Sequence, residues 1–479
     1  MPYTIKQLPN ISEDDGKLKR IRKGKKTFYR SISNLVIDKV QSAFGIALHM
    51  HQPTIPAGID DMHTAGLISN LQHMMEHQDI HDNHNAPVFM ECYSRMSDFI
   101  RELADRESNP RVMLDYSGNL LWGLQQMEKG RVLDNLKSVT VNKKYHRYVE
   151  WLGTMWSHAV VSSTPVPDIR LHIAAWQEHF ASIFGYPALE RVRGFSPPEM
   201  HLPIHPDACY EYVKALKEYG YKWLMVQEHT IENTDGAPVR RPHIPHRLVA
   251  KNSLGYTAEI AVLIKTQGSD TKLVGQMQPY YEAKTRSREE YCGKNAPLFV
   301  LQISDGENGG VIMNEFPPAY KKVFAEVGTE GVVAMNGTEY LEFIEKMGIE
   351  EKDFIAVQPI SQYKIWEHMD GYSRGAADRA IEKAKQKYSG LNLDSASWTN
   401  DKNWVKGYEK VLDPINKLSV EFHRRFDGAP ADTKDPRYKE ALLYLLLSQT
   451  SCFRYWGTGI WTEYAREICR RGMEALKGF

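Results

Sequence analysis

The chain has 479 residues with 60 basic and 60 acidic side chains, so its formal net charge at pH 7 is zero when the histidines are neutral. This balance argues against nucleic acid or an anionic membrane as the main partner, because both attract strongly basic surfaces. The composition, 42% hydrophobic and 25% charged, is typical of soluble globular proteins. The chain is rich in aromatic residues and histidine, with 10 Trp, 25 Tyr and 18 His. These side chains suit packed cores or a cleft for flat, hydroxylated ligands.

Targeting signals and cysteine usage predict a cytoplasmic protein. The first residues lack the apolar core and cleavage site of a secretory signal, and no apolar run is long enough to span a membrane. The 5 cysteines are scattered without a CxxC pair, so neither a disulfide framework nor a structural zinc site is expected. We expect no membrane partner and no nucleic-acid partner, and the sequence leaves the oligomeric state open.

Residues 1–40 are polar and carry a basic cluster. We expect a solvated N-terminal arm there, because a run of like charges usually faces water. The cluster consists of Lys17, Lys19, Arg20, Arg22, Lys23, Lys25 and Lys26.

From about residue 41 to 370, short apolar runs alternate with amphipathic stretches. Helices are expected at 168–184 and 206–219, because Gly185 and Gly220 follow them as glycines follow helix C-termini. Repeated strand–helix units indicate an α/β fold with a parallel sheet, either a barrel or a doubly wound sheet. Strands are expected at 44–49, 87–92, 111–116, 149–153, 191–196, 222–227 and 298–304.

After residue 370 the pattern changes to long amphipathic helices without strands between them. We therefore expect a C-terminal helical region at 371–479. Its expected helices are 372–388, 401–426, 435–450 and 460–477.

The first candidate site follows the apolar run at 44–49, where the sequence reads His49-Met50-His51-Gln52-Pro53. Residues two apart on a strand point to one face, so His49 and His51 can converge at the carboxyl end of the strand. In parallel α/β folds this end carries the active site. The histidines could be plainly packed, could bind a metal, or could join Gln52 in gripping substrate hydroxyls.

Two carboxylates, Glu199 and Asp305, each follow an expected strand. Pro197 and Pro198 stiffen the turn before Glu199, and a glycine-rich segment follows Asp305. Two acids flanking a bond are the minimal equipment of a glycoside hydrolase, since one attacks the anomeric carbon and the other protonates the leaving oxygen. The second acid must stay partly protonated, to which the nearby charge of Glu307 can contribute.

Taken in order, the motifs between residues 44 and 470 resemble those of glycoside hydrolase family 57. Residues 49–53 resemble the opening motif of the family, and residues 149–158, with His158, resemble its second motif. Residues 194–199 resemble the block that carries the family's nucleophile, and residues 304–309 the block that carries its acid/base. Residues 449–457 resemble the last block, which reaches into the active-site cleft.

The resemblance implies an incomplete (β/α)7 barrel of the TIM type at 41–370, followed by a helical region at 371–479 that completes the cleft. It also implies a retaining double displacement on α-glucosidic bonds, without a cofactor or metal, in which Glu199 is the nucleophile and Asp305 the acid/base. The expected substrate is an α-glucan or malto-oligosaccharide. The expected substrate-binding residues are His49, His51, Gln52, His158, Trp156, Phe195, Glu307 and Trp456.

The sequence just before Glu199 differs from the family pattern. Many members carry a Trp-Leu pair before the Pro-Glu of this block, whereas this chain has Phe195 and Ser196 there. We therefore leave open whether the enzyme hydrolyses, transfers or branches glucans. Two other classes compete, namely a metal-dependent hydrolase of the amidohydrolase or deacetylase type that uses His49 and His51, and a non-catalytic glucan-binding protein.

Overall fold

The computed structural model describes residues 7–12, 16–24, 26–56, 61–266, 271–307, 315–391, 393, 409–428, 432–455 and 459–479. Within them, seven parallel strands follow one another in the order β13–β1–β4–β5–β6–β7–β10. Lys265 at the end of β10 pairs with Leu301 of β13, which closes the ring. The expected parallel (β/α)7 barrel is therefore confirmed. The strands are β1 (Val40–Met50), β4 (Val112–Tyr116), β5 (Val149–Gly153), β6 (Gly194–Phe195), β7 (Trp223–Gln227), β10 (Thr257–Lys265) and β13 (Leu298–Asp305).

The apolar runs of the sequence predicted most of these strands. β4, β5 and β7 are buried along their whole length, as expected for parallel strands covered on both faces. The expected strand at 87–92 is wrong, because this run lies inside the 20-residue amphipathic helix α3 (Ala86–Asp105). β10 was not predicted, since its first half is partly exposed and pairs with the antiparallel strand β9 (His246–Lys251).

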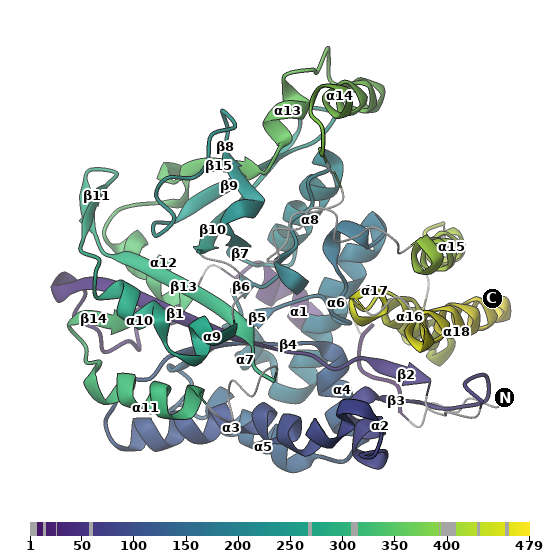
Figure 1. Ribbon diagram of the computed structural model, residues 1–479, viewed down its shortest axis with the longest axis horizontal. Coiled ribbons are helices and arrows are strands. Elements are labelled where there is room, and N and C mark those ends of the chain that lie inside the picture. Colours follow the sequence, from purple (N-terminus) through teal and green to yellow (C-terminus); the bar gives the residue numbers. More distant parts are fainter. Residues whose placement is uncertain are drawn as a thin grey trace.

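Helices surround the barrel on its outside (Figure 1). The predicted helix ends are confirmed, since Gly185 and Gly220 hold φ angles of 85° and 84° after their helices. This left-handed backbone favours glycine, which has no Cβ to clash. The helices between the barrel strands include α4 (Gly118–Gln126), α5 (Gly130–Thr140), α6 (Val166–Phe184), α8 (Pro206–Glu218), α11 (Phe316–Glu326) and α12 (Gly337–Lys346).

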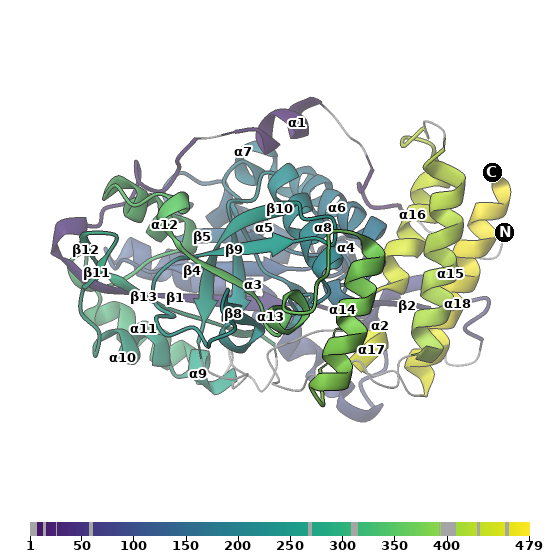
Figure 2. The same ribbon diagram turned by 90° about the horizontal axis from the view of Figure 1, so that it is seen from above.

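The N-terminal segment packs on the barrel, so the expectation of a solvated arm is wrong for its described residues. Leu18 in α1 (Gly16–Arg22) is buried, while the charged side chains around it face water. The Arg22 guanidinium lies 4.2 Å from the centre of the Tyr219 ring and donates to Gln177 Oε1 at 3.0 Å. Figure 2 shows the segment running along one side of the molecule. Lys25 lies outside the described residues.

The predicted C-terminal helices are confirmed where the structure describes them. Three of them, α15 (Glu409–Phe426), α16 (Pro436–Ser448) and α18 (Ile460–Ala475), pack side by side (Figures 1 and 2). In contrast, α14 (Arg374–Lys387) packs on α13 (Gln362–Trp366) around a small apolar cluster. Residues 401–408 of the second expected helix lie outside the described residues.

A buried polar network joins α15 and the end of α16 to the barrel. Asp168 of α6 has no exposed surface; its carboxylate accepts from Gln449 Nε2 at 2.6 Å and lies 2.6 Å from His423 Nε2. Gln449 Oε1 in turn lies 2.9 Å from His172 Nε2. These contacts fix the segment after α16 against α6, beside the carboxyl ends of the strands.

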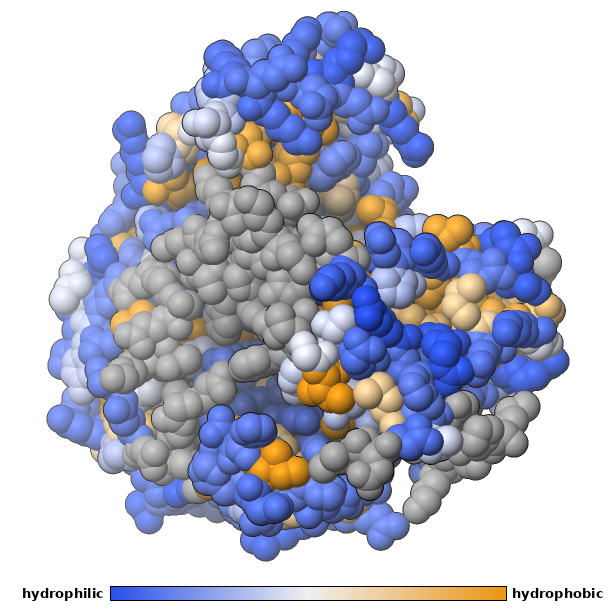
Figure 3. Space-filling model, turned by 45° about the vertical axis from the view of Figure 1, so that its right-hand side comes forward, coloured by the Kyte–Doolittle hydropathy of each residue, from blue (hydrophilic) through white to orange (hydrophobic). Residues whose placement is uncertain are grey.

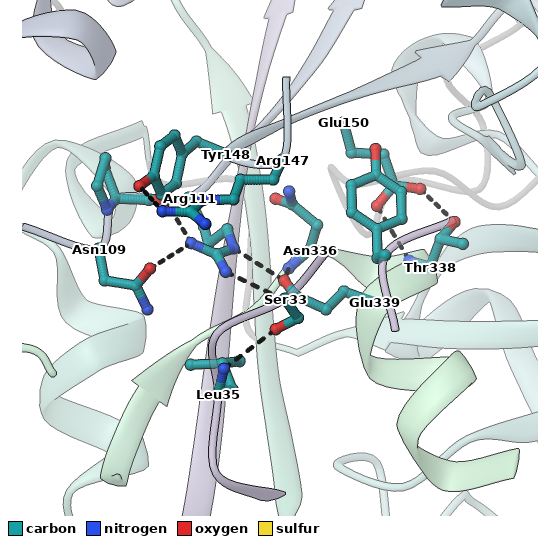
Figure 4. Close-up of polar contacts among 12 residues, drawn as sticks. Ser33, Leu35, Asn109, Arg111, Arg147, Tyr148, Glu150, Asn336, Thr338 and Glu339 are labelled. Atoms are coloured by element: carbon teal, nitrogen blue, oxygen red, sulfur yellow. Dashed lines mark hydrogen bonds and ion pairs between the residues drawn. The ribbon is translucent and has the colours of Figure 1, made fainter. Parts of the chain in front are cut away.

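The amino end of the barrel is closed by a buried ion pair and by a buried, hydrogen-bonded glutamate (Figure 4). Arg111 Nε lies 2.8 Å from Glu339 Oε2, and both side chains are 1% exposed. Glu150 of β5 accepts from the backbone N–H of Thr338 at 3.0 Å and from its hydroxyl. Burial raises the pKa of Glu150 to about 8. These buried groups join the starts of β4 and β5 to the start of α12 and so close the barrel at the end away from the candidate site.

The surface in Figure 3 is mainly hydrophilic, with apolar residues in small separate groups. In the described part of the chain, no helix combines the length and the apolarity that crossing a membrane requires.

Candidate active site

His49 lies in a row of three ionisable residues on neighbouring barrel strands. It is the register partner of Asp305 on β13 and of Asp115 on β4. His49 Nδ1 is 3.1 Å from Asp115 Oδ2, and the aspartate is 1% exposed. Burial lowers the pKa of His49, but the charge and hydrogen bond of Asp115, with the charges of Asp305 and Glu307, raise it to about 10. The contact with Asp115 therefore favours the protonated form of His49.

Asp115 was missed among the predicted site residues. The signal was present, because it is the one charged residue in the buried strand sequence VMLDY of β4. A carboxylate is almost never fully buried unless it has a partner.

His158 lies between the two histidines of the opening motif. Its ring centre is 4.3 Å from that of His49 and 4.4 Å from that of His51, whereas His49 and His51 are 6.5 Å apart. Burial and the charge of His49 lower the pKa of His51 and of His158 well below the usual range. The three predicted histidines thus converge as a stack, with His49 charged and the other two neutral.

Glu199 contacts this stack from the turn after β6. Its Oε1 lies 3.7 Å from His158 Nδ1, and its side chain is 9% exposed. Pro197 and Pro198 precede it, and Glu199 itself holds a left-handed φ of 57°. Such backbone strain in a residue other than glycine is often found at functional sites.

Asp305 ends β13 next to His49, and the following residues fold over the end of β1. Gly306 N–H donates to the His49 carbonyl at 2.8 Å, and His51 N–H donates to Glu307 Oε1 at 3.0 Å. Glu307 is buried, and its burial together with the charge of Asp305 raises its pKa to about 8. Glu307 therefore carries a proton near neutral pH, two residues from Asp305.

Two hydroxyl groups after α16 contact the histidine stack, although neither residue was predicted. Thr450 Oγ1 lies 3.2 Å from His51 Nε2, and Ser451 Oγ lies 2.7 Å from His158 Nδ1. A backbone bridge between Ala159 and Thr450 holds the segment in place. Only the distant motif at 449–457 pointed to this contact in the sequence.

Other polar residues lie at the same edge of the barrel. Gln227 ends β7 and its register partner Lys265 ends β10; both are 1% exposed. Burial lowers the pKa of Lys265 to about 8. Neither residue was predicted, because each follows an apolar run without any recognisable motif.

Two predicted aromatic contacts with substrate are corrected. Trp156 has no exposed surface, donates from its indole N–H to His179 Nδ1 at 3.1 Å and packs against Gly118. Phe195 is equally buried and packs edge-on against Tyr221 with ring centres 5.0 Å apart. Both rings belong to the core of the barrel, and neither presents a face to a ligand.

Gln52 and Trp456 are the remaining predicted substrate-binding residues. Gln52 is 7% exposed, and its side-chain oxygen accepts from Asn70 Nδ2 at 3.1 Å. Trp456 lies outside the described residues. In the described ranges, no cluster of three or more His, Cys, Asp or Glu side chains is arranged to hold a metal ion.

A closed barrel of parallel strands with ionisable side chains at their carboxyl ends is the architecture of a barrel enzyme. Here those side chains include the carboxylates of Glu199 and Asp305 beside the stacked histidines. The family model of glycosyl hydrolase family 57 matches residues 45–267, so the chain carries a domain of that family. The resemblance to this family is confirmed over residues 45–267. The match includes His49 and Glu199 and ends before Asp305, whereas the motifs extended to residue 470.

Solved structures share the fold at low sequence identity. The 4-alpha-glucanotransferase of Thermococcus litoralis superposes with a TM-score of 0.54 at 17% identity, over 90% of this chain and 57% of that one. This chain therefore spans little more than half the length of the glucanotransferase. The branching enzyme of Pyrococcus horikoshii gives a TM-score of 0.48 at 13% identity, over 91% and 88%. A search of curated proteins finds no match.

Proposed function

We propose that the protein is a retaining glycoside hydrolase or transglycosylase that acts on α-glucosidic bonds. The observation that carries the proposal is the chain of contacts from Glu199 to Asp305 inside a family 57 barrel. Glu199 lies 3.7 Å from His158, His158 stacks on His49, and His49 is the register partner of Asp305. Both carboxylates therefore belong to one cluster at the carboxyl edge of the barrel.

The proposed reaction has two steps. Glu199 attacks the anomeric carbon and forms a glycosyl ester, while Asp305 gives its proton to the oxygen that leaves with the rest of the glucan. Asp305 then takes a proton from water, or from a sugar hydroxyl in a transglycosylase, and the new oxygen displaces Glu199. This route requires the two carboxyls to lie roughly 5–5.5 Å apart, against roughly 6.5–9.5 Å for inversion.

The residues around the two carboxylates are proposed to bind the sugar. Neutral His158 can exchange one hydrogen bond with a sugar hydroxyl through Nε2, because Ser451 occupies its Nδ1. Both ring nitrogens of His51 already have hydroxyl partners, Ser117 at 2.7 Å and Thr450 at 3.2 Å, so His51 binds a sugar only by exchanging one of them. Gln52 adds an amide beside them. The α-glucan substrate class is supported by the family and by the glucanotransferase that shares the fold.

The test is product analysis of the purified protein with amylose, maltotriose and pullulan. Shorter chains indicate hydrolysis, redistributed chain lengths indicate transfer, and new α-1,6 bonds indicate branching. The variant Glu199→Gln should lose each activity, whereas Glu345→Gln, at an exposed acid on α12, should keep it. No turnover of any of the three glucans would contradict the proposal. Loss of turnover in chelator would favour the metal-dependent hydrolase instead.

A further inference from the structure

We propose that Asp115 is a positioning residue that holds His49 as an imidazolium beside Asp305 and thereby stabilises the carboxylate that Asp305 becomes when it gives up its proton. The inference rests on the proposed function for the role of Asp305. The contact between Asp115 and His49 rests on their geometry and does not depend on that function.

The geometry places the imidazole between two acids on adjacent strands. Asp115 Oδ2 lies 3.1 Å from His49 Nδ1, and Asp305 occupies the matching register position on the other side of β1. The backbone on both sides is fixed by the barrel, because the carbonyl of His49 also accepts from Gly306 at 2.8 Å. The carboxylate of Asp115 is therefore held where it can accept a hydrogen bond from Nδ1–H of His49.

Of the titratable groups that face His49, Asp115 favours its charged form most. Asp115 faces it from β4, and Asp305 and Glu307 face it from β13 and the residues just beyond. His158 stacks on it from the loop after β5, and His51 lies just past the end of β1. The two other histidines have a lowered pKa and stay neutral, so they do not compete for the proton.

A fixed positive charge beside Asp305 has a defined consequence for the acid step. When Asp305 protonates the leaving oxygen it becomes an anion, and an adjacent cation lowers the free energy of that anion. The proton on His49 is not transferred at any point. Its charge makes Asp305 a stronger acid and places the alkaline limit of activity at a lower pH than a neutral His49 would.

The variant Asp115→Asn removes the charge and keeps the shape and one acceptor for Nδ1–H. His49 should then lose its proton below neutral pH, and the pKa of Asp305 should rise by about one unit. In the kcat/KM profile, the alkaline limb should move upward by a similar amount. Asp115→Glu should restore a protonated His49 and the original alkaline limb, even where kcat is lower. Asp134→Asn, at an exposed acid on α5, is the matched control and should change neither.

The experiment follows the ring of His49 and the carboxyl carbon of Asp305 by NMR with selectively labelled protein, assigned through His49→Gln and Asp305→Asn. We expect the wild-type ring to stay protonated at pH 8 and the Asp115→Asn ring to be neutral at pH 7. A wild-type His49 that is neutral at pH 7, or an Asp305 pKa that is the same in wild type and Asp115→Asn, would overturn the inference. The NMR titrations of His49 and Asp305 can be measured without turnover. A protein that shows the expected titrations but turns over no glucan would therefore contradict the proposed function and leave the role of Asp115 standing.

Discussion

The carboxylate of Glu199 lies 3.7 Å from Nδ1 of His158, and both residues hold a left-handed backbone, with φ angles of 57° and 59°. For residues other than glycine this conformation costs about 1–2 kcal/mol each. Neighbouring structure offsets the cost, because prolines precede Glu199 and the segment with Ser451 holds His158. The fold thus stabilises two unfavourable backbone conformations to bring an acid against the histidine stack.

Glu199→Gln and Asp305→Asn should separate the roles of the two carboxylates. Glu199→Gln should lower kcat by at least about a thousandfold for every substrate, because no ester can form. Asp305→Asn should be much less impaired with a substrate whose leaving group needs no proton, and added azide should rescue it and give a glycosyl azide. Steady-state kinetics with a glucan and an aryl glycoside measure both effects. Equal loss on both substrates in Asp305→Asn would exclude it as the acid.

The hydroxyls of Thr450 and Ser451 should affect activity more than stability. Thr450→Val and Ser451→Ala each remove one partner of a site histidine, so kcat/KM should fall about tenfold, corresponding to roughly 1.4 kcal/mol. Ser448→Ala is the matched control, since Ser448 is buried but donates to the Leu445 carbonyl within α16. Its kcat/KM should be unchanged. Wild-type kcat/KM in both Thr450→Val and Ser451→Ala would show that these contacts do not serve the site.

Trp156→Phe should change the stability of the protein and not its substrate affinity. The substitution leaves a cavity in the core and removes the indole donor of His179, so the free energy of unfolding should fall by about 2 kcal/mol. Urea denaturation measures this loss, and KM should stay within about twofold of wild type. A raised KM with unchanged stability would restore Trp156 to the substrate-binding residues.

Glu467 of α18 should make stability depend on pH in the acid range. Burial raises the pKa of Glu467, but the hydrogen bonds of Arg470, Arg471 and His63 outweigh it and lower that pKa to about 2. An unfolded glutamate titrates near pH 4.3, so the stabilisation is complete above that pH and is lost as the pH falls toward 2. Glu467→Gln should cost about 3–5 kcal/mol at pH 7, since it removes the carboxylate that neutralises the charge of the buried Arg471.

Denaturant unfolding at several pH values checks the contribution of Glu467. The difference in the free energy of unfolding between wild type and Glu467→Gln should become smaller from pH 5 to pH 3. The exposed pair of Glu463 with Arg466 supplies the control, because Glu463→Gln should cost at most about 1 kcal/mol. A gap that stays constant down to pH 3 would show that the ion pairs of Glu467 do not account for it.

Much of the barrel could be predicted because parallel strands are buried on both faces and therefore appear as apolar runs. The strand at 149–153 was predicted residue for residue, as β5. The run at 87–92 looks the same locally but belongs to a helix whose periodicity is visible only over 20 residues. The N-terminal segment was misjudged because its exposed lysines and arginines surround the buried side chain of Leu18.

The site could be predicted in part, for a physical reason. His49, Glu199 and Asp305 each follow an apolar run, and the carboxyl ends of parallel strands meet at one edge. Thr450 reaches the site through tertiary packing, which only the family resemblance of residues 449–457 indicated. Composition likewise cannot tell a stacking tryptophan from a core tryptophan, which is why Trp156 was placed in the cleft.

The central claim is that Glu199 forms a covalent bond with the sugar, and trapping the intermediate tests it most directly. The protein is treated with a 5-fluoroglycosyl fluoride of the malto-oligosaccharide series, and the labelled peptide is identified by mass spectrometry. The account predicts one glycosyl group per chain, attached to Glu199, and no label in Glu199→Gln. A label on another residue, or an active enzyme that releases a product of inverted anomeric configuration, would contradict it.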